Sequence, residues 1–558
     1  MSYRIIGYDS SKLKLPETRE EWRFKLLDNP EHNLAKAIDE TVAVQCGPVN
    51  LAHIPFAPRK DETNEENGIV KRLIHAQHLP KRRLVQEIRQ FVKKEIIPYI
   101  NPLPPGMTDE ELREKWNQDN SYSAKRRQQL KELAEQHKLK YNRPTKEIMK
   151  SKMFMKEEFY EEKKHARLII SRSDTFKGIV GPYIHAFDEE LFHGHFSNNF
   201  VKGKDSKWKV ARMREIQSKY PLYMETDYSS FEGSQCAMIQ DAVEKQVLRH
   251  FLKNYPKIWS YVESTFEEAE IEVIGQKRKE AYERKMPKPS RRDFTELLED
   301  PDLQPSCKHA DIFSKYHRLY LLGNRKSGEM WTSSGNGLLN LVIMKFLAHK
   351  KRISWDGIVE GDDGFFGVSA RYIQADDYSQ LGFTIKLNYE TDPNMLSFCG
   401  LRFSGTGKLV VDPENLNRVG WIVKKRYFHA KKKLKLALLK AKMMSLLAEA
   451  PACPISSVLA KSVIRKIRVK PRFGDQDWWY TQWLSKEKVD LTEEVDYRTR
   501  LDFSVMFGIP VSTQIEMENS FKKDCFSNFF LPIGKGHSDW MASYEEGLVR
   551  DRAPAVIE

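Results

Sequence analysis

Three aspartates carry the clearest chemical signal in this sequence of 558 residues. Asp227 begins the run DYSSFE, and Asp362 and Asp363 follow Gly361 in the second half of the chain. Phosphoryl transfer needs charge neutralised on the attacking, transferred and leaving oxygens, which two divalent ions about 3.5 to 4 Å apart can do. Such ions require several carboxylates close together. The aspartates therefore predict a two-metal site if the fold brings them together.

Two predicted elements would position these acids. Residues 222–226 (LYMET) suit a strand that ends at Asp227, and residues 353–368 (ISWDGIVEGDDGFFGV) contain β-rich runs on both sides of the Gly-Asp-Asp sequence. This pattern predicts a hairpin with acids at its turn. Side-by-side strands would then bring the three aspartates together. Each motif alone is weak, because Gly-Asp-Asp is more often a solvated turn than a metal site.

A glycine- and hydroxyl-rich loop lies between the two acidic motifs. It spans residues 323–336 (GNRKSGEMWTSSGN) and leads into a buried helix predicted for residues 336–349. Small residues let the backbone approach a nucleotide closely, while hydroxyls and an amide can hydrogen-bond sugar oxygens. The ordered combination of three motifs therefore points to nucleotide chemistry more firmly than any one of them.

Asp-x4-Glu, Ser-Gly-x3-Thr-x3-Asn and Gly-Asp-Asp, in this order, resemble the palm of viral RNA-dependent RNA polymerases. The Gly-x-Arg-x-Ser-Gly-x3-Thr-Ser-x-Gly-Asn form is similar to the tombusvirus-like and flavivirus-like polymerases of positive-strand RNA viruses. The resemblance implies an α/β (α+β) fold shaped as a right hand, with an antiparallel-sheet palm. Its parts would be fingers with an N-terminal extension (1–205), palm (206–235 and 318–410), a fingers insertion (236–317), and a mainly helical thumb with the C-terminal region (411–558).

The resemblance also implies the roles of the acidic residues. Asp227 and Asp362 would bind two Mg²⁺ ions, with Mn²⁺ as an alternative. Asp363 would support them, and the carbonyl of Tyr228 would add a ligand. Lys386, in the segment LGFTIK, resembles the lysine near the leaving pyrophosphate and would act as a general acid; the alternative is an outward lysine on a strand. Residues 397–403 resemble the primer-grip hairpin.

Further matches concern the nucleotide. Residues 154–183 resemble the basic fingers segment that lines the nucleotide entry channel, where arginine suits bidentate phosphate contacts. The groups that would neutralise an incoming triphosphate are Lys156, Arg167 and Arg172. The alternative is a solvated charge run.

A second set of residues would sense the ribose 2′-hydroxyl, the group that distinguishes RNA precursors from DNA precursors. The resemblance assigns this network to Glu232, Ser327, Thr332 and Asn336. The family usually has Asp where this chain has Glu232. The extra methylene keeps the carboxylate but shifts its reach, so Glu232 is the residue at which ribose discrimination most needs testing.

The charge balance agrees with a polyanionic partner. The chain has 92 Lys and Arg against 78 Asp and Glu, a formal charge of +14, which suits nucleic acid or an anionic membrane but also an ordinary basic surface. No apolar run is long enough to span a bilayer, and the N-terminus lacks the apolar segment of a signal peptide. Membrane attachment would therefore be peripheral or supplied by another protein.

Cysteine and histidine spacing does not predict a zinc site. The six cysteines include no Cys-x-x-Cys pair, so neither a zinc ribbon nor a dense disulfide scaffold is indicated. The pairs His75/His78 and His193/His195 have no neighbouring cysteine and are interpreted as surface or packing residues.

Several other segments have two interpretations. The lysine-rich helix predicted for residues 429–450 would follow an RNA backbone or pack its apolar side on a core. Trp478, Trp479, Tyr480 and Trp483 would stack on a first nucleotide or pack internally. The hydrophilic residues 276–302 predict an exposed insertion, residues 108–140 a charged helical region, and the sequence GTGK at 405–408 a hairpin turn rather than a phosphate-binding loop.

Two rival functions share some of these features. A reverse transcriptase palm also has paired aspartates, but usually has an aromatic-x-Asp-Asp hairpin and a bulky gate at the position of Glu232. An inactive RNA-binding scaffold would need only the charge, and the intact acids disfavour it. The expected partners are therefore template and product RNA, NTPs, and viral or host membrane-recruiting proteins. The expected location is the host cytoplasm, at membrane-associated replication complexes.

Overall fold

The computed structural model describes residues 8–9, 43–53, 55–69, 72–73, 80–120, 122–141, 143–160, 166–266, 273–274, 309–313, 318–322, 325–392, 395, 397–473 and 491–533. Helices account for 53% of the residues and strands for 13%, which confirms a mixed α+β class. The predicted insertion at 276–302 and the aromatic residues at 478–480 and 483 lie outside the described residues. Among the helices that are described, none combines the length and apolar character needed to cross a membrane.

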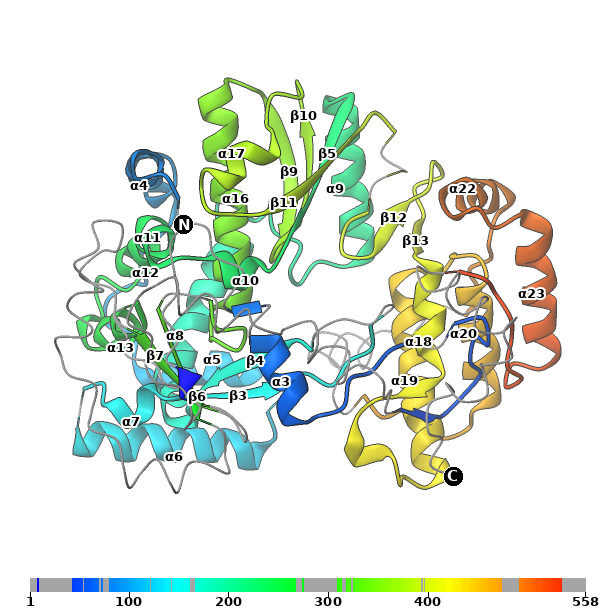
Figure 1. Ribbon diagram of the computed structural model, residues 1–558, viewed down its shortest axis with the longest axis horizontal. Helices are drawn as coiled ribbons and strands as arrows, with labels where there is room; N and C mark the ends of the chain where they lie inside the picture. The colour runs from blue at the N-terminus through cyan, green and yellow to red at the C-terminus, as the bar shows by residue number, and fades with distance from the viewer. Residues whose placement is uncertain are drawn as a thin grey trace.

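An antiparallel sheet of four strands occupies the upper centre of the molecule in Figure 1. Its order is β11 (Ile385–Glu390), β5 (Leu222–Tyr228), β10 (Asp363–Val368) and β9 (Trp355–Glu360). The predicted hairpin at 353–368 is therefore confirmed. The strand predicted to end at Asp227 continues to Tyr228, because β11 pairs with both of these residues.

Both faces of this sheet are buried, since successive side chains of a strand point to opposite faces. Met224 and Phe366 pack into a core that includes α16 (Thr332–Lys351). Tyr223 and Phe365 pack into a second core with residues of α9 (Ser206–Lys219). Figure 1 shows the two helices on either side of the sheet. Helix α16 confirms the buried helix predicted from residue 336.

The left part of the molecule in Figure 1 is mainly helical and contains a second sheet of order β4-β3-β7-β8. The predicted helical region at 108–140 forms two helices, because Thr108 caps the first through a capping box and Ser123 caps the second. The elements of this part are α3 (Glu62–Ile69), α4 (Arg82–Glu95), η2 (Ile97–Tyr99), α5 (Asp109–Asp119), α6 (Ala124–Lys140), α7 (Lys146–Met149), β3 (Ser151–Met155), β4 (Leu168–Arg172), α8 (Asp174–His193), α10 (Phe231–Ser234), α11 (Ala237–Ala242), α12 (Glu244–Phe251), α13 (Pro256–Phe266), β7 (His309–Phe313), β8 (Arg318–Leu322), and the pair β1 (Tyr8–Asp9) and β6 (Val273–Ile274).

The right part contains the C-terminal elements, among them the lysine-rich helix α19. Leu439, Met443 and Leu447 of this helix are fully buried, so its apolar side packs on a core, while the lysines at 431–433 are exposed. The GTGK sequence is the predicted hairpin turn, with Gly407 at a φ of 75°. The elements are β12 (Leu401–Phe403), β13 (Leu409–Val411), η5 (Pro413–Asn415), α18 (Leu416–Val419), β14 (Trp421–Ile422), η6 (Lys425–Tyr427), α19 (Lys432–Glu449), α20 (Ser456–Lys466), α22 (Tyr497–Phe507) and α23 (Val511–Lys523), with α17 (Ala375–Ser379) beside the central sheet.

An N-terminal segment joins the two parts. Strand β2 (Val44–Gln45) pairs with β14, and Asn50 forms a bridge with Phe529 in the right part. Phe56 then forms a bridge with Tyr160 in the left part. Residues 44–56 therefore connect regions that are far apart in the sequence.

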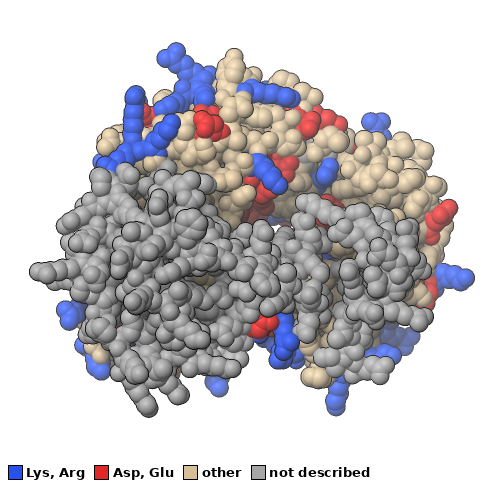
Figure 2. Space-filling model, viewed as in Figure 1, with Lys and Arg blue, Asp and Glu red and all other residues tan. Residues whose placement is uncertain are grey.

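Basic side chains are not evenly spread over the surface. Figure 2 shows Lys and Arg gathered at the upper left of the view, where Figure 1 places α4 and the upper end of α16. Exposed basic residues of these elements and their ends are Lys81, Arg82, Arg83, Lys93, Lys94, Lys350 and Arg352. Clustered charge creates a stronger local electrostatic potential than the same charge spread evenly over the surface.

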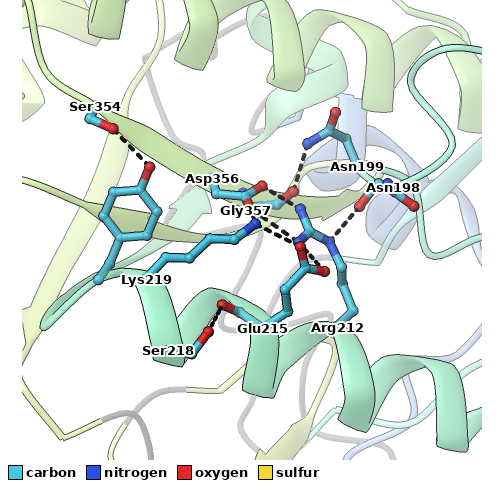
Figure 3. Close-up of polar contacts among 10 residues, drawn as sticks. Asn198, Asn199, Arg212, Glu215, Ser218, Lys219, Ser354, Asp356 and Gly357 are labelled. Atoms are coloured by element: carbon cyan, nitrogen blue, oxygen red, sulfur yellow. Dashed lines mark hydrogen bonds and ion pairs between the residues drawn. The ribbon is translucent and has the colours of Figure 1, made fainter.

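A polar network fixes α9 to the edge strand β9 (Figure 3). Arg212 binds Asp356 with both terminal nitrogens and donates through Nε to the carbonyl of Asn198 at 2.9 Å. Lys219 Nζ lies 3.2 Å from the same carboxylate. Burial alone would raise the pKa of Asp356, but hydrogen bonds and charge from Arg212 and Lys219 outweigh it and lower the pKa. Asp356 is therefore a structural anion with its cations in place.

Candidate active site

The strand register brings the predicted acids together. Gly364 pairs with Thr226, so continuing the register by one residue places Asp363 beside Asp227. On the other side of β5, Lys386 is the direct partner of Asp227. Directly opposed residues of antiparallel strands point to the same face with Cβ atoms about 5 Å apart. Asp227 therefore lies between an acid and a lysine on one face of the sheet.

Asp362 is presented by a two-residue turn. Glu360 pairs with Asp363, so Gly361 and Asp362 form the loop of the β9–β10 hairpin. Gly361 has a φ of 60°, and Asp362 is not among the residues with positive φ, which matches a type II′ turn. Glycine is required at the first position of this turn because an L side chain is disfavoured at positive φ. The turn leaves Asp362 and Asp227 exposed.

The turn is held from below by Asn340 of α16, a residue that sequence reasoning missed. The side chain of Asn340 is fully buried, and its Nδ2 lies 3.3, 3.0 and 3.1 Å from the carbonyl oxygens of residues 361, 362 and 363. Its Oδ1 is 3.4 Å from the hydroxyl of Tyr228, whose ring is buried. An amide within the apolar run NGLLNLVIMKFLAH was the available signal, since buried polar groups require partners.

The acids have unusual electrostatic surroundings. Burial, followed by the charge of Asp362, raises the pKa of Asp363 to about 7. Burial also raises the pKa of Asp362, and the charge of Asp227 adds to it, although a backbone hydrogen bond and Arg167 act in the opposite direction. None of the three aspartates forms an ion pair with another described residue. These carboxylates are therefore held near one another with no basic side chain of a described residue at ion-pair distance, although Lys386 and Arg167 lie in the vicinity.

This donor set fits a divalent cation, because hard cations prefer carboxylate oxygens and a bound cation would relieve the repulsion. The three carboxylates do not all lie within 4.8 Å of one another. The one group in the described part of the chain that meets this distance is Asp119, His185 and Glu189, which lies on α5 and α8 with two exposed members.

A second hairpin packs beside the acids. Ser397, just before β12, donates its backbone N–H and its hydroxyl to Glu225 at 3.2 and 2.8 Å. Cys399, at a φ of 54°, donates a hydrogen bond to Asp363. The segment predicted as a primer grip therefore lies against the acidic face of the sheet.

Two guanidinium groups lie close enough to influence the acids. Arg167 lowers the pKa of Asp362 and of Glu232, and Arg72 does so more weakly. Arg167 is half-exposed, with its Nε 3.5 Å from Glu158. Lys156 pairs with the same Glu158 at 2.6 Å and is also half-exposed. Arg72 was missed because the region before residue 150 had no legible chemistry, and only the fold places it here.

Arg172 occupies a different position from the one predicted. Its side chain is buried, its Nε lies 2.8 Å from Glu329, and it donates to the carbonyl of Met149 at 2.9 Å. Its guanidinium also lies 5.3 Å from the centre of the Phe176 ring. The prediction that Arg172 meets a triphosphate is therefore corrected: its charge is compensated inside the protein, where it fixes the loop that contains Glu329.

Glu232 lies on α10, directly after a sharp change of chain direction at Ser230, whose φ is 51°. Burial raises the pKa of Glu232 to about 7, and Asp362 adds to this effect, while Arg167, Arg325 and Arg72 oppose it. The side chain is thus close enough to Asp362 to feel its charge, as expected of a residue that would contact the ribose.

The other three predicted ribose residues do not bond directly to one another. Ser327 donates to the carbonyl of Leu168 at 2.7 Å, and Thr332 donates to the carbonyl of Lys326 at 2.8 Å. The Ser327 hydroxyl thus ties the loop to β4, and the Thr332 hydroxyl bonds within the loop. Asn336 is buried and accepts from Gln235 at 2.8 Å and from Arg325 at 3.1 Å. Residues 323 and 324 of this loop lie outside the described part.

The histidines are accounted for by packing or ion pairs. His195 stacks on Tyr99 with ring centroids 4.3 Å apart. His193 Nε2 lies 3.8 Å from Glu189, an acidic partner contributed by the preceding helical turn. His75 and His78 are outside the described residues.

Comparison with models of known protein families and with curated proteins finds no significant match for this chain. Its function must therefore be inferred from the residues of the site.

Proposed function

We propose that this protein is a viral RNA-dependent RNA polymerase of the positive-strand type, which adds ribonucleotides to an RNA 3′ end under the direction of a template. The observation that supports this most is that Asp227, Asp362 and Asp363 lie together at one end of the central sheet, with no ion pair to another described residue. A nucleotidyl transfer needs such an anionic cluster to hold divalent metal. The right-hand arrangement and its domain boundaries belong to this proposal.

In the proposed reaction Asp227, Asp362, Asp363 and the carbonyl of Tyr228 would hold two Mg²⁺ ions. Bound Mg²⁺ would activate the attacking 3′-hydroxyl and neutralise charge on the phosphates. The chain's own groups do the rest. Arg167 and Arg72, which lower the pKa of Asp362, would neutralise the triphosphate, and Lys386, which is exposed beside Asp227, would protonate the leaving pyrophosphate. Glu232 and Asn336 contact the ribose.

The test is an extension assay with the full chain on a defined RNA, with and without a primer, in the presence of Mg²⁺ or Mn²⁺. We expect template-dependent RNA product with NTPs, no product without metal, and poor use of dNTPs. Glu232→Asp keeps the carboxylate but shortens the side chain by one methylene, and it should change the ratio of NTP to dNTP use. Wild-type protein that binds RNA but never extends it would identify a scaffold, and preferential use of dNTPs would identify a reverse transcriptase.

Recruitment to membranes is a further part of the proposal. A polymerase of this type would work in the host cytoplasm at membrane-associated replication complexes, with viral or host proteins as its membrane partners. Co-expression with candidate partners followed by membrane flotation tests this separately from catalysis.

A further inference from the structure

A buried ion pair lies directly behind the predicted ribose residues. Arg325 and Glu244 are 3% and 1% exposed, and the guanidinium binds both carboxylate oxygens, with Nη1 at 2.6 Å from Oε1. Neither residue belongs to the predicted site. Two charges of this kind need a strong structural reason, because removing ions from water is costly.

Arg325 contacts two of the predicted ribose residues. Its Nε donates to Asn336 Oδ1 at 3.1 Å, and its backbone N–H donates to the carbonyl of Glu232 at 3.0 Å. Gly335 makes this possible, since a Cβ there would lie 2.7 Å from Arg325 Nη2. The guanidinium therefore lies between the acid anchor on α12 and the first turns of α16.

The charge of Arg325 determines which way the Asn336 amide points. A guanidinium only donates, so the atom that faces Nε must be an oxygen. Gln235, at 2.8 Å from the same oxygen, must then present its Nε2. This arrangement leaves Gln235 Oε1 buried and unsatisfied, which costs about 1 to 3 kcal/mol and is tolerated only because the charged donor takes precedence.

We propose that the Glu244–Arg325 pair is a specificity-determining positioning device, which fixes Asn336 so that its Nδ2 group is the donor offered to the ribose 2′-hydroxyl. This inference rests on the proposed polymerase function. Asn336 Nδ2 has no hydrogen-bond partner among the described residues, whereas its Oδ1 accepts twice. The pair acts through Asn336 and does not itself contact the substrate.

The test measures kcat/KM for an NTP and for its 2′-fluoro and 2′-deoxy analogues on one template. Fluorine accepts weakly and cannot donate, so a fixed donor makes the wild-type enzyme use the 2′-fluoro analogue better than the 2′-deoxy analogue. Arg325→Lys cannot both bind Glu244 at two points and donate to Asn336. We expect the NTP-to-dNTP preference of this variant to fall by about tenfold, as for loss of one hydrogen bond, and its 2′-fluoro advantage to disappear.

The matched control is Arg500→Lys. Arg500 and Glu518 form a similar bidentate pair in the C-terminal part of the chain, with both distances 2.7 Å, the carboxylate buried and the guanidinium largely buried. This variant should lose thermal stability like Arg325→Lys but keep both nucleotide ratios.

Each outcome decides the question. If wild-type protein makes no RNA, the polymerase proposal itself fails. If it makes RNA but uses the 2′-fluoro and 2′-deoxy analogues equally, or if Arg325→Lys keeps the wild-type ratios, the positioning role is wrong. Equal loss of ratio in Arg500→Lys would also overturn it. If Arg325→Lys does not fold, the comparison of the two analogues with wild-type protein still tests whether a fixed donor faces the 2′ position.

Discussion

The β9–β10 hairpin has acids at both ends: Asp362 and Asp363 at its turn, and Asp356 near the start of β9. Their electrostatic surroundings are opposite. Asp356 on β9 is bound by Arg212 and Lys219, and its pKa is lowered. Asp363 on β10 is partly buried beside Asp362, and its pKa is raised to about 7. The charge of Asp356 is balanced by two ion pairs within the protein, whereas Asp363 forms no ion pair with a described residue. Carboxylates kept together without compensation are characteristic of functional sites, because the fold gains nothing from them.

The largest effect is expected from Asp362→Asn. Loss of a metal ligand should reduce Mg²⁺-dependent incorporation by more than about a thousandfold, since metal stabilisation of the transition state is worth several kcal/mol. RNA binding should be nearly unchanged, and the melting temperature equal or higher because a like charge is removed. Extension, RNA binding and thermal melting measure the three quantities. Asp376→Asn on α17 is the exposed control and should retain activity.

The opposite pattern is expected from Asp356→Ala. Removing this carboxylate leaves the buried Arg212 without its main partner, which should lower the free energy of unfolding by about 3 kcal/mol. The folded fraction should keep its activity per molecule. Chemical denaturation compares this variant with Glu215→Ala, which removes a half-exposed partner of the same two cations and should cost less than about 1 kcal/mol. Equal losses of unfolding free energy in the two variants would show that Asp356 is not the main residue holding α9 to β9.

A third carboxylate tests the effect of burial without metal chemistry. Burial raises the pKa of Asp188 to about 7, although Ser334 donates to it. Its folded-state pKa lies above the unfolded value, so its contribution to stability is present at low pH and is lost as the pH rises towards 7. Asp188→Asn should therefore gain about 2 kcal/mol over wild type between pH 5 and pH 8. Denaturation curves at both pH values measure this, and the exposed neighbour Glu189→Gln should show no such trend.

The smallest effect concerns the turn itself. Gly361→Ala meets no neighbouring atom within 4 Å, but its positive φ should cost about 1 kcal/mol of stability. Gly106 has a φ of 87° and equally open surroundings in a turn remote from the acids. Gly106→Ala should thus lose similar stability and keep full activity, whereas Gly361→Ala should also slow extension. If both variants extend RNA equally well, the precise placing of Asp362 is unimportant.

The central hairpin and the meeting of the acids could be predicted because they depend on local patterns: two β-rich runs, a Gly-Asp turn and a strand ending near Asp227. Ion-pair partners could not. Arg172 was expected at the nucleotide because it lies in a basic segment, yet it pairs with Glu329, 157 positions away. A charged side chain has no periodicity that reveals its partner. Arg72 and Arg325 were overlooked for the same reason. Asn340 was overlooked because its role depends on the β9–β10 turn that packs against it.

The N-terminal segment has a consequence for synthesis and folding. Gln45 bonds to Asn528, 483 positions away, and Asn50 bonds to the backbone of Leu531. A ribosome adds roughly 5 to 20 residues per second, so residues 44–50 wait on the order of half a minute or more before their partners emerge. Asn417 is made earlier, but until Leu531 emerges the buried Asn50 lacks the backbone carbonyl to which it donates. Residues 44–50 are therefore synthesised early but reach their native contacts late. Nascent chains that lack the C-terminal residues should expose this segment to proteases.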